Sequence, residues 1–184
     1  MFTRKLVTIL VGVMFFGVCS AKATTIIFES GHYIWTDADP YYDEVFLKND
    51  ASLDFLSGSI GKLEIIHYGL ANIYGGNMTS IWTFDDSIAH IHGGDIDILA
   101  AFSDSEVYLY TDDFIYSPTG GAENNGYVEG LYYNTNVAFY ISFYDDTSYS
   151  NLSIVPEPTT FLLFCFGWIA VRKRNLLENH FRGE

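Results

Sequence analysis

Cysteine and positive charge are both scarce in this sequence. Its two cysteines, Cys19 and Cys165, lie near the ends, and the segment 24–157 has none. That segment also has no arginine, and its two lysines stand against 21 aspartates and glutamates, which leaves a formal charge of −19. Disulfides therefore cannot stabilise it, and its stability must come from apolar burial and backbone hydrogen bonds. So many carboxylates repel nucleic acid and anionic lipid, and we expect no nucleic-acid partner.

Residues 40–111 repeat with a period of 18, and this repeat organises the chain. The four copies are 40–57, 58–75, 76–93 and 94–111. Small residues, mostly glycine, begin and end the copies, and apolar residues recur at fixed positions between them. With one lysine as the exception, these positions are Tyr42/Ile60/Met78/Ile96, Val45/Leu63/Ile81/Leu99, Lys48/Ile66/Phe84/Phe102, Leu53/Ala71/Ala89/Val107 and Phe55/Ile73/Ile91/Leu109. A unit this short cannot bury its own apolar face, so the period indicates stacked units.

The period predicts an all-β fold, a short parallel β-helix (β-solenoid) with 18-residue coils stacked about 4.8 Å apart. In the second half of each copy apolar residues alternate, as in a half-buried strand. In the first half they come at every third residue, as at Tyr42, Val45 and Lys48 in the first copy. This spacing favours a path that turns corners around a narrow core. The pairs Gly75–Gly76 and Gly93–Gly94 would supply the positive φ of a tight corner. A meander of β-hairpins has the same period and is the alternative.

The segments on either side of the repeat are predicted to close the solenoid. Residues 24–39 are interpreted as an irregular first coil or N-terminal cap strand, because terminal units of a stack are atypical. Residues 112–155 combine a loop rich in proline, glycine and asparagine with strand-like segments at 127–132, 137–143 and 151–155. We expect this closing loop and its strands to cover the C-terminal end.

The two ends of the chain carry targeting features. Residues 1–23 have a basic tip, an apolar run and an Ala21-Lys22-Ala23 cleavage site, the pattern of a secretory signal peptide with its helix. Residues 156–184 begin with Pro156-Glu157-Pro158, continue with an apolar run of 13 residues and reach the basic cluster Arg172-Lys173-Arg174. This run predicts a transmembrane helix that is short against the roughly 20 residues of a usual span. The basic cluster would stay on the cytoplasmic side.

The order of Pro-Glu-Pro, short apolar segment and basic cluster resembles the PEP-CTERM sorting signal of exported Gram-negative proteins. The middle of the chain is similar to cargo proteins of this class with Gly-Gly/Asp-Ser repeats, as in Gly75-Gly76, Asp86-Ser87 and Asp104-Ser105. The resemblance implies processing by signal peptidase and exosortase, transient anchoring in the inner membrane, and delivery to the outer surface or exopolysaccharide matrix. It brings no catalytic residues. The tail 175–184 departs from the pattern, because it is longer than the few residues that usually follow the basic cluster.

One outward column of the repeat is aromatic and is the candidate binding face. It contains Tyr74, His92 and Tyr110, and aromatic rings in a row could stack against sugar rings as a glycan face. The alternative is cross-strand packing that only stabilises the sheet. His90 and His92 flank the inward Ile91 and could supply two ligands of a metal site. The alternative there is a ladder with His92 between Tyr74 and Tyr110.

Acidic residues at the corners are weak candidates for Ca²⁺ ligands, because stacked corners could gather carboxylates. The candidates are Asp85, Asp86 and Asp104. The calcium nonapeptide is absent, since Gly93-Gly94-Asp95-Ile96-Asp97 has isoleucine where the third glycine belongs. Solvated acidic turns are the default interpretation, and we expect no metal or other cofactor.

These observations favour an exported, non-enzymatic structural protein of the surface or biofilm matrix, with exopolysaccharide as a possible partner. The alternative is a glycan- or Ca²⁺-binding adhesion module on the same face. An exported polysaccharide-active enzyme comes third, because no motif nominates a nucleophile and four coils offer little length for a substrate groove.

Overall fold

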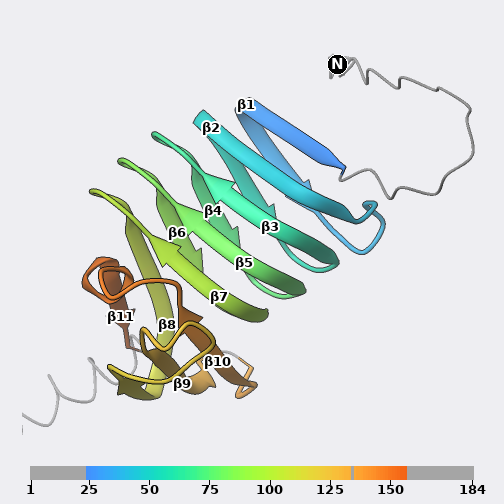
Figure 1. Ribbon diagram of the computed structural model, residues 1–184. Coiled ribbons are helices and arrows are strands. Elements are labelled where there is room, and N and C mark those ends of the chain that lie inside the picture. Colours follow the sequence, from blue (N-terminus) through green and yellow to red (C-terminus); the bar gives the residue numbers. More distant parts are fainter. Residues whose placement is uncertain (1–23, 134, 157–184) are drawn as a thin grey trace, which may run out of the picture.

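The computed structural model describes residues 24–133 and 135–156, and Figure 1 shows their arrangement. The predicted signal peptide and everything after Pro156, including the predicted transmembrane helix, lie outside the described residues. Within the described ranges no helix is long and apolar enough to cross a membrane. The elements are β1 (Thr25–Trp35), β2 (Tyr42–Phe55), β3 (Ser59–Ile65), β4 (Leu70–Ile73), β5 (Asn77–Thr83), β6 (Ile88–Ile91), β7 (Asp95–Ala101), β8 (Glu106–Ser117), β9 (Tyr127–Tyr132), β10 (Ala138–Phe143), the 3₁₀ helix η1 (Ser148–Asn151) and β11 (Leu152–Val155).

The repeat forms a parallel β-solenoid, as predicted. The first half of β2 continues into a parallel sheet with β3, β5 and β7, and its second half into another with β4, β6 and β8 (Figure 1). Residues 18 apart pair with one another, as Ile60 does with Met78 and Ala71 with Ala89. The Asn77 N–H donates to the Gly58 carbonyl at 2.9 Å, and the Asp95 N–H to the Gly76 carbonyl at 2.8 Å. The corners therefore lie one above another, and the hairpin meander is wrong.

The core differs from the predicted pattern in one column. Val45, Leu53 and Phe55, with their equivalents in each coil, are fully buried as expected. The third inward column of the first sheet is Leu47/Ile65/Thr83/Ala101, whereas Lys48/Ile66/Phe84/Phe102 lies outside and is half-buried. The spacing of three holds only between Tyr42 and Val45, where the β2–β3 ladder skips a position. Beyond Val45 the strand alternates regularly, so the next inward residue is two positions on, not three.

Two kinds of corner connect the two sheets. At one, Gly58, Gly76 and Gly94 have φ values of 98°, 80° and 106°, so the second glycine of each pair supplies the predicted left-handed conformation. At the other corner the left-handed residues are not glycines, and the residue pattern does not predict them. They are Asn49, His67, Asp85 and Ser103, with φ between 55° and 61°.

The closing segment resumes the solenoid after an insertion. β8 runs beyond its coil and pairs antiparallel with β9, which pairs antiparallel with β10. The end of β10 then joins β7 in parallel, with Ser142 opposite Ile98, and β11 joins β8 in parallel, with Leu152 opposite Val107. Closing strands were expected here. That they form a further coil was not, because its register lies 44 or 45 residues after the previous coil instead of 18.

Candidate functional site

The predicted aromatic column forms a ladder on the outer face of the second sheet. The rings of Tyr74 and His92 are stacked with centroids 4.9 Å apart and planes 9° apart, and those of His92 and Tyr110 lie 3.9 Å and 20° apart. His90, in the neighbouring column, stacks on Tyr108 at 5.0 Å, and its Nδ1 lies 3.1 Å from the Tyr110 hydroxyl. The structure thus brings together all three residues of the candidate glycan face, and it places His92 between the two tyrosines.

The ladder presents ring edges more than ring faces. Both faces of the His92 ring are covered by its stacked neighbours, so this ring cannot also stack on a sugar. Tyr74 remains 46% exposed, beside Leu56 at 45%. The geometry therefore favours cross-strand packing for His92 and leaves Tyr74 as the ring of this column best placed to meet a ligand.

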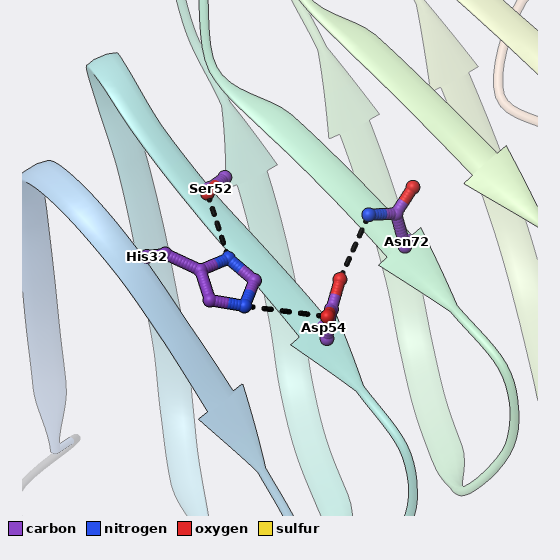
Figure 2. A network of polar contacts seen from close by, with 4 residues as sticks. All are labelled: His32, Ser52, Asp54 and Asn72. Carbon is purple, nitrogen blue, oxygen red and sulfur yellow. Dashed lines mark hydrogen bonds and ion pairs between the residues drawn. The ribbon is translucent and has the colours of Figure 1, made fainter.

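A polar network extends the same face toward the N-terminal end. His32 on β1 lies with Nδ1 2.9 Å from the Ser52 hydroxyl and Nε2 3.3 Å from the Asp54 carboxylate (Figure 2). The Asn72 amide donates to the same carboxylate at 2.8 Å. These side chains join three successive coils by hydrogen bonds, as the rings do further along. The outer face is thus a continuous set of contacts between coils.

Burial changes the protonation of the ladder histidines. Desolvation lowers the pKa of His90 from its usual 6.5, and it lowers that of His92, which the charge on His90 lowers further. A hydrogen bond to Glu106 raises the pKa of the Tyr108 hydroxyl, to which burial and the Glu106 charge also contribute. Near neutral pH both imidazoles are therefore neutral, which suits stacking on phenol rings.

The stability of the solenoid should fall as the pH drops below the usual histidine value of about 6.5. Because the folded-state pKa values are lowered, the unfolded chain binds more protons, and the free energy of unfolding decreases with falling pH until the folded groups also titrate. His92→Phe keeps a stacked ring but removes one titrating group. Urea denaturation of both proteins between pH 7.5 and 5 should therefore give the variant the smaller loss of stability. Identical losses would show that His92 does not contribute.

The weak Ca²⁺ candidates Asp85, Asp86 and Asp104 lie at the same corner of successive coils. Asp85 is one of the left-handed corner residues, and its carboxylate lies 3.0 Å from Nδ1 of His67 on the preceding coil. Asp86 and Asp104 are exposed at the same corner. In the described part of the chain no three histidine, cysteine, aspartate or glutamate side chains come together as metal ligands would.

A second aromatic cluster, on the outer face of the first sheet, was missed in the sequence. Phe84 and Phe102 stack at 5.0 Å, and Trp82 lies 4.7 Å from the Tyr144 ring. The Lys62 ammonium lies 5.4 Å from the Trp82 ring centre, and the lysine pairs with Glu44 at 3.2 Å and Glu64 at 2.6 Å. Its hydrogen bond to Glu64 is the main cause that raises the pKa of Lys62. Phe84 and Phe102 belong to one column of the repeat, which the spacing of three wrongly predicts to face the core.

A hollow of about 470 Å³ lies beside Tyr74, along the glycine corners. The Tyr74 ring forms part of its wall, and Asn77 and Asp95 supply an amide and a carboxylate. An aromatic ring next to hydrogen-bonding side chains is the combination by which proteins hold small polar ligands. The hollow is a candidate site beside the aromatic ladder.

Of the predicted sorting-signal residues, the described part includes Pro156, which is exposed directly after β11. Glu157, Pro158, Arg172, Lys173 and Arg174 lie outside it. No protein-family model, curated protein or solved structure matches the chain at a significant level.

Proposed function

We propose that this chain is an exported, non-enzymatic structural protein, sorted by a PEP-CTERM signal to the cell surface or exopolysaccharide matrix of a Gram-negative bacterium. The observation that carries the proposal is the order of features after β11: Pro156-Glu157-Pro158, an apolar run and Arg172-Lys173-Arg174. The apolar run with its cleavage site at the N-terminus supports export.

The body of the protein suits a structural role. Its coils are joined by backbone ladders on two sheets and by side-chain contacts on both outer faces. It needs no disulfide, and its acidic surface keeps it soluble and apart from anionic lipid. Ladder bonding between adjacent coils makes a stiff module, which a matrix component requires.

The sorting signal is tested by comparing processing in a host with an exosortase and in the same host without it. The full chain should appear at the surface in a shortened form when the exosortase is present, and should remain in the inner membrane when it is absent. Pro156→Ala/Glu157→Ala/Pro158→Ala should abolish the loss of the C-terminal segment but not the removal of the signal peptide, as measured by intact mass and cell fractionation. Glu178→Ala, which removes a carboxylate from the tail, is the control. Unchanged processing of the triple variant would refute the proposal.

A second candidate, a glycan-binding adhesion module, is favoured by the hollow beside Tyr74. In this case the full chain should bind the exopolysaccharide of the producing organism, and Tyr74→Ala should weaken binding by up to about tenfold, because an aromatic stack contributes about 0.5–1.5 kcal/mol. Tyr110→Ala is the matched control, since Tyr110 is not part of the hollow. Repeating the titration with and without Ca²⁺ tests the cation dependence of an adhesion module. Equal binding by all three proteins would dismiss this site.

A further inference from the structure

The N-terminal end of the solenoid is an open sheet edge. Within the described residues β1 pairs with β2 alone, so its outer edge forms the end of the stack (Figure 1). An unpaired edge presents free N–H and C=O groups to another strand, and proteins usually block such edges with lysine, proline or several charges. β1 has neither lysine nor proline, Glu29 is its one acidic residue, and Ile27 and Ile34 point outward with exposures of 49% and 60%. Among the residues that the structure describes, this edge is long, nearly neutral and unpaired.

The residues of β1 are chemically symmetric about a point between Ser30 and Gly31. Positions at equal distances from this point face the same side of the strand. Apolar or aromatic residues match one another in three pairs, and in the fourth pair an acid matches a histidine. The matched pairs are Ile26/Trp35, Ile27/Ile34, Phe28/Tyr33 and Glu29/His32. The register of β1 against β2 shifts next to this point, between Phe28 and Ser30, and the two arms of the strand belong to the two sheets. The shift keeps the alternation of inward and outward residues symmetric.

The free backbone groups follow the same symmetry. The Thr24 carbonyl accepts from the Asp43 N–H at 3.0 Å, and the Trp35 carbonyl from the Leu56 N–H at 3.0 Å, so both point toward the second coil. Successive residues of a strand direct their backbone groups to opposite edges. Residue 27 on one arm and residue 34 on the other therefore direct theirs to the free edge.

We propose that the chain forms a head-to-head homodimer, in which β1 pairs antiparallel with β1 of a second copy about a two-fold axis between Ser30 and Gly31. The axis exchanges the two arms of β1 and sets Ile27 of one copy opposite Ile34 of the other, as a hydrogen-bonded pair on the outer face. Glu29 then lies opposite His32, which Ser52 and Asp54 hold in place (Figure 2), and not opposite a second carboxylate.

Charge and strand length select a second copy at this end. The acidic bodies of two copies repel one another, but only one of the 21 acidic residues of segment 24–157 lies on β1. At the C-terminal end of the solenoid, β10 already pairs with β9, and β11 has four residues. A head-to-tail filament would therefore pair the 11 residues of β1 with a much shorter sheet edge. A self-complementary edge gives a closed two-fold dimer.

Sedimentation of the purified full chain in mild detergent, over a range of concentrations, tests the dimer. Ile34→Lys should raise the dimer dissociation constant about tenfold or more, because the symmetry repeats the lost apolar pair twice. Leu56→Lys is the matched control: Leu56 is outward and 45% exposed on the next coil, away from the edge, and should leave the constant unchanged. Far-UV circular dichroism of each variant checks that the solenoid is folded.

Disulfide trapping tests the register. In a Cys19→Ser/Cys165→Ser background, Ile27→Cys and Ile34→Cys are purified separately, then mixed and oxidised. The mixture should yield a disulfide between positions 27 and 34, because hydrogen-bonded antiparallel residues have Cα atoms about 5.5 Å apart, within disulfide range. Neither variant alone should cross-link. A monomer at all concentrations, growth beyond two copies, an Ile34→Lys chain that associates as before, or cross-linking of either single variant would overturn the proposal. None of these readouts depends on sorting, so the proposed function is tested independently.

Discussion

Replacing Phe55 by alanine should lower the free energy of unfolding by about 3–5 kcal/mol, because a fully buried ring is lost and the core around it cannot collapse freely. Phe55 is 0% exposed and packs against Trp35, with ring centres 6.3 Å apart. Its ring also occupies the space that a side chain at Gly76 would need, since a Cβ there would lie 2.4 Å from Phe55 Cε1. The ring thus lies between the coil of β1, at Trp35, and the corner at Gly76.

The measurement is urea denaturation of the full chain, followed by far-UV circular dichroism. Leu56→Ala is the control, because Leu56 is the next residue along the chain but points outward, and its loss should cost about 1 kcal/mol or less. Similar losses in both variants would mean that Phe55 does not belong to a close-packed core. A biphasic transition in Phe55→Ala would locate the weakened contact at the N-terminal coils, since a stacked repeat can separate between neighbouring units.

The repeat predicted the architecture because the period fixes the coil length and the alternation fixes one sheet. It assigned one column of the first sheet to the wrong side, since residue type alone does not separate inside from outside there. Phe84 and Phe102 are apolar but lie outside, where they stack on each other. Thr83 is polar but fully buried, where its hydroxyl lies 2.9 Å from that of Ser105. A pairwise hydrogen bond in the core and a ring stack on the surface are contacts between coils, which the spacing within one coil does not show.

The candidate site was predictable to the same extent. The period and the inward Ile91 were sufficient to place Tyr74, His92 and Tyr110 in one outward column. The orientation of the rings, which leaves His92 without a free face, depends on side-chain angles that the spacing does not determine. The spacing does not predict the final coil, because residues 112–137 separate it from the repeat and the antiparallel strand β9 interrupts the parallel order.

The first glycine of each corner pair is required for close approach, and Gly93→Ala should therefore destabilise the solenoid by about 2–3 kcal/mol. Gly93 does not have a positive φ, unlike Gly94. A Cβ at Gly93 would lie 2.4 Å from the Tyr74 carbonyl oxygen on the preceding coil. This distance is shorter than a carbon and an oxygen can approach without a bond between them. The backbone has no room to retreat, because the His92 N–H is bonded to the Ile73 carbonyl at 2.7 Å and the Asp95 N–H to the Gly76 carbonyl at 2.8 Å.

Gly120→Ala separates this clash from the usual effects of replacing glycine. Gly120 has a φ of 92°, but a Cβ there would meet nothing closer than 3.5 Å, so we expect a loss of about 1 kcal/mol from the left-handed conformation alone. Both substitutions restrict the unfolded chain equally, whereas only Gly120→Ala adds the strain of a left-handed conformation, so the excess loss in Gly93→Ala is a lower bound on the cost of forcing two coils apart. If Gly93→Ala lost no more stability than Gly120→Ala, the coils would not be in close contact at this corner.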